Sequence, residues 1–391
     1  MRILLLSFYF EPDLSAGSFR MAGLVEALQR QIGPEARIDV MTTQPNRYAS
    51  YSQAALPEEA RGAVMVKRFA LPAHRSGFLG QSRAFAAYAY QVIKATRGSQ
   101  YDLVFSTSSR LLTAALGAFV ASRVRAPLYL DIRDIFVDTL QDVLSPLAAC
   151  LVLPFFRFVE KLTVRRAAHI NLVSAGFLEY FSDRYPGVCF SVIPNGIDDV
   201  FMGVDYAKET VGCKTIVLYA GNIGEGQGLV HIIPGLAKAF CDSHEFWVVG
   251  DGGQRSQLEG AVNGLNNVKI MSPVNRKDLL ALYRRSDILF LHLNDYPAFR
   301  KVLPSKLFEY AVTGKPIVAG VAGYAAQFLQ QVTGVVVFQP CHVEDGVAAI
   351  RDVKLGPVSR QPFVERYRRA LLMQELAVSL LAVAKSGASQ G

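Results

Sequence analysis

The sequence predicts an α/β protein built from two doubly wound, Rossmann-like units, each a parallel sheet with helices on both faces. Short apolar runs alternate with helical patterns along all 391 residues, and the runs are continuous rather than alternating. Continuous apolar runs are typical of parallel strands that are buried on both faces. With 51% hydrophobic and 19% charged residues, the chain can build two full cores, which excludes a disordered protein.

The predicted strands fall into two groups separated by a turn-rich break. The break reads Pro-Asn-Gly-Ile-Asp-Asp at residues 194–199. We therefore expect a first domain over residues 1–197 and a second over residues 198–361. The final helical pattern has no strand after it, so residues 362–391 are expected to form a helix that packs back on the first domain. Seven predicted strands precede the break and six follow it: 3–7, 38–42, 64–69, 103–106, 128–130, 170–173 and 190–193, then 215–220, 246–249, 268–271, 288–291, 317–321 and 335–338.

A short helix near residue 306 has the features of a nucleotide site. Ser305 is a helix-start residue and Gly314 a helix-stop residue. Between them Lys306 and Glu309 stand three positions apart, hence on one face. The ammonium of Lys306 and the first amides of the helix attract phosphate, and a carboxylate one turn later can accept hydrogen bonds from both ribose hydroxyls.

Glycine-rich loops follow two predicted strands of the second domain. Gly221 and Gly224 come after the strand at 215–220, and Gly250-Asp251-Gly252 come after the strand at 246–249. Ligands of open parallel sheets bind beyond the carboxyl ends of the strands, and a missing side chain lets backbone amides approach an anion. An ordinary tight turn is the alternative for both loops. We expect the ligand in a cleft where two such domains face each other.

One segment of the first domain carries two carboxylates and a guanidinium. The stretch 130–136 reads Leu-Asp-Ile-Arg-Asp-Ile-Phe and leaves the end of a predicted buried strand. Asp131 or Asp134 could deprotonate an acceptor hydroxyl, and Arg133 could bind a phosphate. The alternative is an Asp–Arg pair that only fixes the loop.

The net charge of +8 is concentrated in the first domain. Residues 61–166 hold 15 Lys and Arg against 6 Asp and Glu. Within this region the nearly uncharged run 143–159 overlaps and precedes a group of cations: Arg157, Lys161, Arg165 and Arg166. Basic residues beside aromatic and aliphatic ones suit an anionic membrane surface, although a buried helix with a solvated basic face is the alternative. No nucleic-acid reader motif accompanies the charge, so we expect no nucleic-acid partner.

Cysteine use and the N-terminus indicate a cytoplasmic protein. The five cysteines are scattered and form no CxxC pair, which favours a reducing compartment and gives no zinc site. The N-terminal apolar run is about eight residues, short for a signal peptide, and no segment reaches the roughly 20 uninterrupted apolar residues of a membrane span. The chain also has no Asp-x-Asp signature for a metal-bound diphosphate, so no metal or other cofactor is expected.

Several segments together resemble the retaining GT-B glycosyltransferases of family 4. They read Tyr-Ala-Gly-Asn-Ile-Gly-Glu-Gly-Gln-Gly at 219–228, Val-Gly-Asp-Gly-Gly at 249–253 and Pro-Ser-Lys-Leu-Phe-Glu-Tyr at 304–310, with Gly-Lys-Pro at 314–316. Segments 8–12, 173–177 and 193–198 also fit. The most similar group is that of bacterial cell-surface polysaccharide transferases related to N-acetyl-L-fucosaminyltransferases. The resemblance implies a GT-B fold with a C-terminal helix that crosses back to the first domain.

The resemblance also implies roles for single residues. Val274 lies in the loop that reads the base, and an acceptor-side loop corresponds to Gly17, Ser18 and Arg20. The diphosphate is held by cations and helix amides instead of a metal.

Two departures from the family pattern concern the donor site. Asn222 and Gln227 stand where many members have an Arg and a Lys that clamp the diphosphate. Charge compensation would then fall to Lys306, with Arg300. Lys301 replaces the glutamate that usually stands eight residues before the position of Glu309.

The function implied by the resemblance is transfer of a sugar, such as an N-acetylated hexosamine or deoxyhexosamine, from a UDP-sugar. The acceptor would be a polyprenyl-diphosphate-linked saccharide for O-antigen or capsule, at the inner face of the plasma membrane. The enzyme would be a peripheral membrane protein and would retain the anomeric configuration. Two alternatives are a UDP-sugar 2-epimerase on the same fold and a non-catalytic, membrane-associated partner subunit.

Overall fold

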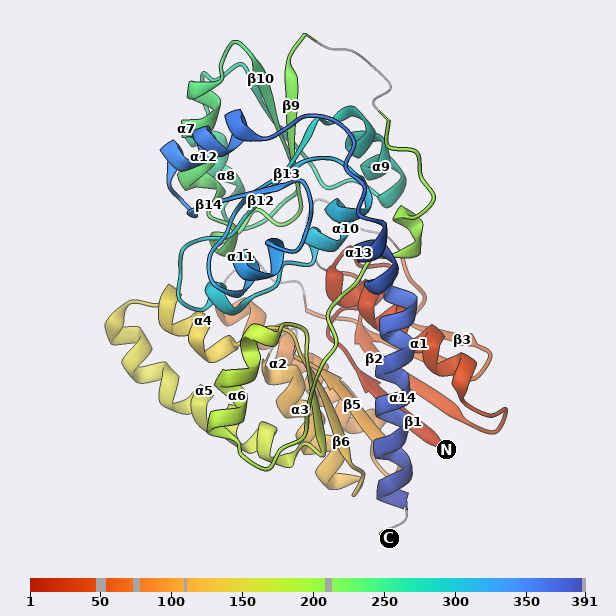
Figure 1. The fold of residues 1–391 in the computed structure, drawn as a ribbon. Helices are drawn as coiled ribbons and strands as arrows, with labels where there is room; N and C mark the ends of the chain where they lie inside the picture. The colour runs from red at the N-terminus through yellow and green to blue at the C-terminus, as the bar shows by residue number, and fades with distance from the viewer. Residues whose placement is uncertain (47–53, 73–77, 109–110, 208–212, 389–391) are drawn as a thin grey trace. The chain divides into compact units, whose positions relative to one another are not determined.

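The computed structural model describes residues 1–46, 54–72, 78–108, 111–207 and 213–388. The chain forms two compact units (Figure 1). The first comprises Met1–Asn195 and Ala370–Gly391, and the second comprises Gly196–Arg369. The first boundary lies close to the predicted one after residue 197, whereas the second lies after Arg369 and not after residue 361.

The first unit is built on an eight-stranded sheet in the order β3-β4-β2-β1-β5-β6-β7-β8. All neighbouring strands are parallel except β3 and β4. The seven predicted strands are confirmed. The sequence did not predict β3, because this antiparallel edge strand is mostly charged and exposed. The bounds are β1 (Arg2–Leu6), β2 (Arg37–Thr43), β3 (Glu58–Arg61), β4 (Val64–Phe69), β5 (Leu103–Thr107), β6 (Leu128–Ile132), β7 (His169–Leu172) and β8 (Phe190–Val192).

The second unit is built on a six-stranded parallel sheet in the order β11-β10-β9-β12-β13-β14. All six predicted strands are present. The order reverses between β9 and β12, and such a switch point opens a crevice at the carboxyl ends of the strands. The bounds are β9 (Thr215–Ala220), β10 (His244–Val249), β11 (Val268–Met271), β12 (Ile288–His292), β13 (Ile317–Gly320) and β14 (Val335–Phe338).

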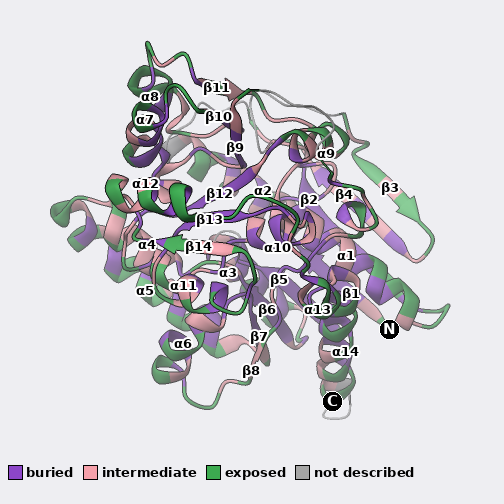
Figure 2. Cartoon of the chain, turned by 45° about the horizontal axis from the view of Figure 1, so that its top comes forward, coloured by how far each residue is buried: buried purple, intermediate pink, exposed green. Residues whose placement is uncertain are grey.

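Helices cover the sheets, and the strands between them are largely buried (Figure 2). The first unit contains α1 (Ala16–Gln31), α2 (Phe78–Ala95), α3 (Leu111–Arg123), α4 (Phe136–Val143), α5 (Pro146–Arg166) and α6 (Leu178–Arg184). The second contains α7 (Leu229–Ala239), α8 (Arg255–Ala261), α9 (Arg276–Arg285), α10 (Lys306–Val312), α11 (Tyr324–Leu329), α12 (Val343–Asp352) and α13 (Gln361–Arg366).

The predicted C-terminal helix is two helices. α13 ends at Arg366, and α14 (Arg369–Ala388) continues into the first unit. Between α13 and α14 the backbone hydrogen-bonds to Ile197, which follows β8 in the sequence. Ile197 donates its N–H to the carbonyl of Tyr367 at 2.7 Å, and Arg369 donates its N–H to the carbonyl of Ile197 at 2.7 Å. These bonds interrupt the helical ladder at the point where the chain changes unit.

α14 packs against the first unit with one face. The buried residues recur at helical spacing, and the hydroxyls of Tyr129 and Ser379 hydrogen-bond at 2.9 Å. Within the described part of the chain, this is the one helix whose length and composition would allow a membrane crossing, with a mean hydropathy of 1.3 over Arg369–Gly387. A helix packed on a sheet passes the same test. The buried face is made by Met373, Leu376, Ala377, Leu380 and Ala384.

Candidate active site

Two glycine loops of the second unit touch through their backbones at the carboxyl ends of β9 and β10. Gly221 donates its N–H to the carbonyl of Val249 at 2.8 Å. Gly250 has a φ of 154°, and a Cβ added there would overlap the carbonyl oxygen of Gly221. Gly252, with a φ of 156°, is pressed in the same way against the carbonyl of Ile223. Side chains are excluded at Gly250 and Gly252, so the backbone itself forms this edge of the site.

Lys306 occupies the space left by the missing side chain of Gly221. A Cβ on Gly221 would overlap the Cε atom of Lys306. The ammonium hydrogen-bonds the hydroxyl of Tyr219 and lies 4.0 Å from the centroid of the Tyr219 ring. Burial lowers the pKa of Lys306 to about 7. The Glu309 carboxylate opposes this shift but does not outweigh burial, so an anionic ligand would further favour the charged form.

Glu309 lies one turn further along α10 and is also short of compensation. Its Oε2 accepts a hydrogen bond of 3.4 Å from the hydroxyl of Tyr283. Burial raises the pKa of Glu309, although the nearby guanidinium groups of Arg369 and Arg276 oppose the shift. The carboxylate therefore has acceptor capacity to offer to a ligand with hydroxyl groups.

The placement of α10 follows from Tyr310. The hydroxyl of this fully buried residue accepts a 3.0 Å hydrogen bond from the N–H of Ala220, the last residue of β9. This bond ties the helix to the strand that ends at the first glycine loop. Lys306 and Glu309 are thereby brought to the loop that begins at Gly221.

The two uncharged residues that depart from the family pattern bond to each other. Asn222 donates from Nδ2 to Oε1 of Gln227 at 2.7 Å. The same oxygen accepts from the N–H of Gly224 at 3.2 Å, and the hydroxyl of Tyr219 donates to the carbonyl of Asn222 at 2.6 Å. Asn222 and Gln227 therefore shape the loop without adding charge to it.

His292 holds the same loop from β12. Its Nε2 accepts from the N–H of Cys341 at 3.0 Å, so the proton lies on Nδ1, which donates to the carbonyl of Gln227 at 2.7 Å. Burial lowers the pKa of His292 to about 4, which keeps the ring neutral. Both ring nitrogens are engaged, so His292 is a positioning residue of the loop and has no free nitrogen for acid–base chemistry.

The remaining predicted donor residues lie on loops of the same unit. Asp251 accepts from the N–H of Gly252 at 2.8 Å, and Val274 lies partly buried between β11 and α9. Ser305 stands at the N-cap of α10, but its side chain makes no capping bond. Arg300 is exposed and forms a bidentate ion pair with Asp295, in which Nε donates to Oδ1 at 3.1 Å and Nη2 donates to Oδ2 at 3.2 Å. A diphosphate would have to compete with this carboxylate for Arg300.

In the first unit, Arg20 and Asp131 form a buried ion pair. The carboxylate accepts two bonds of 2.9 Å from the guanidinium and one of 2.8 Å from Nδ2 of Asn171. Arg20 also donates to the carbonyls of Ile193 and Pro194, at 3.0 and 2.6 Å. Each side chain is 1% exposed. The pair thus holds α1, β6, β7 and the segment after β8 together. The predicted roles of Asp131 in catalysis and of Arg20 on the acceptor side stay predictions.

The other first-unit candidates come from two segments: Arg133 and Asp134 directly follow β6, and Gly17 and Ser18 lie in the first turn of α1. Asp134 is exposed, and the N–H of Arg133 donates to Oγ of Ser108 at 3.0 Å. A Cβ on Gly17 would lie 3.7 Å from the guanidinium of Arg133, so these two candidates from distant segments are neighbours. Ser18 is buried and its N–H donates to Ser15 Oγ, the N-cap of α1, at 3.2 Å. Ser18 thus belongs to a helix start.

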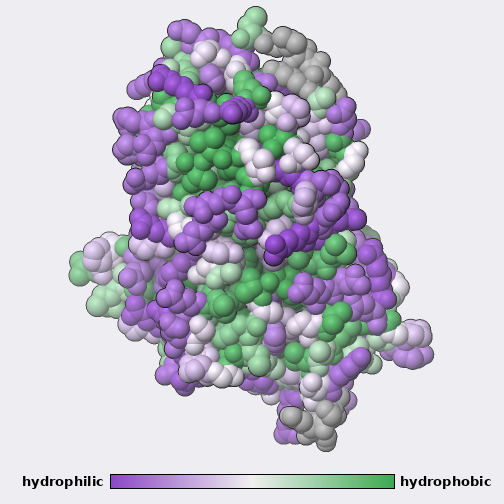
Figure 3. All heavy atoms as spheres, viewed as in Figure 1, coloured by the Kyte–Doolittle hydropathy of each residue, from purple (hydrophilic) through white to green (hydrophobic). Residues whose placement is uncertain are grey.

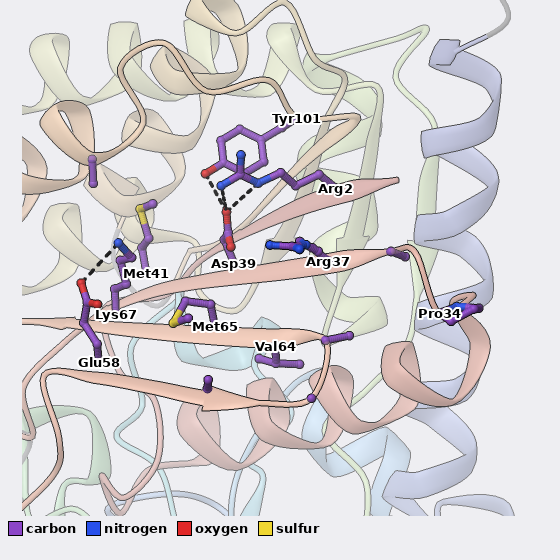
Figure 4. A pocket seen from close by; sticks show the side chains of 15 residues that line it. Arg2, Pro34, Arg37, Asp39, Met41, Glu58, Val64, Met65, Lys67 and Tyr101 are labelled. Atoms are coloured by element: carbon purple, nitrogen blue, oxygen red, sulfur yellow. Dashed lines mark hydrogen bonds and ion pairs between the residues drawn. The ribbon is translucent and has the colours of Figure 1, made fainter.

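A groove of about 510 Å³ on the face of β2 and β4 is lined by none of the predicted site residues (Figure 4). Four of its charged groups form pairs: Asp39 accepts from Arg2 at 2.6 Å and from the hydroxyl of Tyr101 at 3.0 Å, and Lys67 lies 3.3 Å from Glu58. Among the described residues, no group of three His, Cys, Asp or Glu side chains could hold a metal ion.

Sequence reasoning gave no role to two tyrosines that contact the candidate residues: Tyr219, whose hydroxyl bonds to the loop, and Tyr283, whose hydroxyl bonds to Glu309. Tyr219 lies on β9, and Tyr283 lies on α9. From the sequence alone such residues are ordinary core positions. Their polar atoms reveal a role only when the neighbours are known.

The buried ion pair leads to a stability prediction. Asp131→Asn should lower the free energy of unfolding by about 3 kcal/mol, because the guanidinium of Arg20 would stay buried without its counter-charge. Denaturant unfolding measures this. Asp134→Asn, at an exposed position, is the matched control and should change stability by less than about 0.5 kcal/mol. Equal, small effects of both variants would contradict a structural ion pair.

Two glycosyltransferase family models match the chain. The model described as "Glycosyl transferase 4-like domain" matches residues 17–196, and "Glycosyl transferases group 1" matches residues 214–353. The putative colanic acid biosynthesis glycosyl transferase WcaI of Escherichia coli K12 is 33% identical over 149 residues. That match covers 37% of this chain and 36% of WcaI, so it spans little more than a third of the relative.

Solved structures share the fold over nearly the whole chain. Sucrose-phosphate synthase of Thermosynechococcus elongatus aligns with a TM-score of 0.69 at 17% identity, covering 100% of this chain and 98% of that one. HepE of Anabaena, in complex with UDP and glucose, aligns with a TM-score of 0.61 at 18% identity, covering 100% and 99%. With its two parallel α/β units and with both domain models matched in order, the chain belongs to the family 4 glycosyltransferases of the GT-B fold.

Proposed function

We propose that the protein transfers a sugar from a UDP-sugar, and that the second unit holds the nucleotide. The observation that carries this proposal is the pair formed by Lys306 and Glu309 at the loop of Gly221. The ammonium would bind the diphosphate, and the carboxylate would accept hydrogen bonds from the ribose. The solved complexes of HepE with UDP and with UDP-glucose, which share the fold, support this class of donor.

The diphosphate is the leaving group of this reaction, and its negative charge grows as the sugar departs. Lys306 is placed to stabilise that charge, because its ammonium sits where no side chain intervenes between it and the loop backbone. Asn222 and Gln227 add no charge, so Lys306 carries more of this task than a lysine in a site with additional cations would. The proposal includes no metal and no cofactor besides the UDP-sugar substrate.

The first unit would bind the acceptor. Asp134 is the candidate for the base that receives the proton of the acceptor hydroxyl, since Asp131 is occupied by Arg20. Arg133 and Gly17 would bind a phosphate of the acceptor. We further propose a polyprenyl-diphosphate-linked saccharide as acceptor, an N-acetylated sugar as donor group, and retention at the anomeric carbon. The similarity to a colanic acid glycosyl transferase supports a role in surface polysaccharide synthesis, such as O-antigen or capsule, at the cytoplasmic face of the plasma membrane.

A non-catalytic partner subunit is the second candidate, favoured by the uncharged pair Asn222 and Gln227. Binding of UDP separates the two, because a degenerate subunit would not respond to the nucleotide. The epimerase alternative would need further acid–base groups. His292 does not supply one, since both of its nitrogens are hydrogen-bonded.

Replacement of Glu309 tests the ribose contact. Glu309→Ala should weaken UDP binding roughly a hundredfold, because two hydrogen bonds to a carboxylate are lost. Titration calorimetry measures the affinity. Glu259→Ala, an exposed carboxylate on α8 of the same unit, is the control and should leave the affinity unchanged. Equal affinity of the Glu309 variant and the wild type would remove the nucleotide assignment.

Proton uptake tests the diphosphate contact. The pKa of Lys306 is about 7 without ligand, and a bound diphosphate would raise it. Binding of UDP-glucose should therefore add about one proton to Lys306 at pH 8, where the free amine is mostly neutral, and almost none at pH 6, where it is already charged. Calorimetry in two buffers of different ionisation enthalpy measures the uptake. Lys306→Arg stays charged at both pH values and should abolish it. Wild-type binding at pH 8 without proton uptake would show that Lys306 does not meet the diphosphate.

Replacement of Asp134 tests the base. Asp134→Asn should lower turnover by a factor of about 10² to 10⁴ while UDP affinity stays the same. Release of UDP in the presence of membrane lipid extract from the source organism measures turnover. Asp183→Asn, another exposed carboxylate of the first unit, serves as the control. Full activity of the Asp134 variant would exclude it as the base.

A further inference from the structure

The helix α5 exposes an apolar stripe. Five large side chains follow one another at intervals of four, four, three and four residues, which places them on one side of a helix. A surface helix of a soluble protein normally turns such a stripe toward the core. Here the exposed fractions are 83% for Leu147, 82% for Leu151, 59% for Phe155, 59% for Phe158 and 55% for Leu162.

The opposite side of α5 is already packed. Leu153 and Phe156 of α5 form a small core with Leu111 of α3 and Val137 of α4, and the rings of Phe136 and Phe156 meet edge to face at 5.1 Å. The helix is therefore anchored without its apolar stripe. The stripe is a surface of the folded unit and not a face that the sheet has failed to cover.

Cations border the stripe on one side. Arg157, Lys161 and Arg165 recur every four residues and are exposed, whereas the first half of the helix carries no charge. The one carboxylate of α5, Glu160, is turned inward, where it accepts hydrogen bonds of 3.0 Å from the hydroxyls of Tyr180 and Tyr185. The exposed half of α5 is thus apolar and cationic, with no acidic group.

We propose that α5 is the membrane-docking helix of the protein and lies in the interface of an anionic bilayer. Leu147, Leu151 and Phe155 would enter the boundary of the acyl chains, and the row Arg157, Lys161 and Arg165 would meet the lipid phosphates. In Figure 3, green side chains gather at the left over the outer end of the α4–α5 pair. Five exposed apolar side chains on one helix form a contiguous patch, and such patches mark interaction surfaces.

The cationic row of α5 favours a lipid surface over a second copy of the chain as the partner of the stripe. In a two-fold contact the same patch faces itself, so two cationic rows would be brought together. An anionic bilayer instead supplies both an apolar phase and complementary charge. The inference goes beyond the proposed transferase function and does not depend on it, because the stripe belongs to the first unit and involves no donor residue.

Co-sedimentation with vesicles tests the stripe. The full chain should bind vesicles of phosphatidylcholine with phosphatidylglycerol, bind those of phosphatidylcholine alone far less, and lose binding as salt is raised. Leu147→Ser combined with Leu151→Ser should reduce binding at least roughly tenfold. Leu355→Ser, at a leucine of the second unit that is 58% exposed, is the matched control and should bind like the wild type.

A second set of variants tests the cations. Replacing Arg157, Lys161 and Arg165 together by Gln should lower partitioning onto the anionic vesicles by roughly a hundredfold. The same change at three exposed cations of the second unit (Arg351, Lys354 and Arg366) should have little effect. Unchanged co-sedimentation of both α5 variants would overturn the proposal.

Association with a second copy of the chain would give a different result in sedimentation. If the stripe mediated self-association, the wild type would sediment as a dimer without lipid and the leucine variant as a monomer, which would also overturn the proposal. The melting temperature shows that each variant is folded without reference to nucleotide. Failure of UDP binding with intact vesicle binding would count against the proposed function alone.

Discussion

The proposed donor site depends on the contact between two backbone loops that leave no room for a side chain. Where the loops after β9 and β10 meet, the carbonyl of Gly221 fills the space that a Cβ on Gly250 would need. Lys306 then takes the space above Gly221. The amine of Lys306 is thereby held against peptide groups and the ring of Tyr219. Its burial there favours the neutral amine, and a bound anion would favour the charged form.

The two units treat buried charge in opposite ways. Arg20 and Asp131 of the first unit are paired, fully hydrogen-bonded and closed to solvent, which suits a link between a helix and several strands. Lys306 and Glu309 of the second unit are only partly buried, and each has a pKa moved toward its neutral form. A ligand with phosphate and hydroxyl groups would relieve both. Titratable groups whose pKa values are shifted toward the neutral form are frequent in binding sites, whereas a fully paired charge is frequent in a scaffold.

The loop after β9 keeps a fixed shape although two of its residues differ from those that many family members have. Asn222 and Gln227 lack the charge of the residues they replace, yet they bond to each other and, through Gln227, to His292. The loop is therefore held in one shape from both ends. The loop therefore lacks positive charge of its own, and the ammonium of Lys306 lies against it at Gly221.

The sequence by itself determined the parallel sheets, their division into two units and the helix that carries Lys306 and Glu309. These features rest on local signals: continuous apolar runs, turn residues and the spacing of two charges on one helical turn. The edge strand β3 escaped notice because its side chains are charged and exposed, and the last helix was predicted as continuous because the bonds of Ile197 that interrupt it come from 170 residues earlier in the chain. Only the tertiary structure showed that Asp131 is buried in an ion pair and that Asp134 is exposed, since the difference depends on Arg20 and Asn171, which lie on other elements. It alone also showed that the apolar residues of α5 face outward, because a helical period reveals that a stripe exists but not which side of the helix the rest of the protein covers.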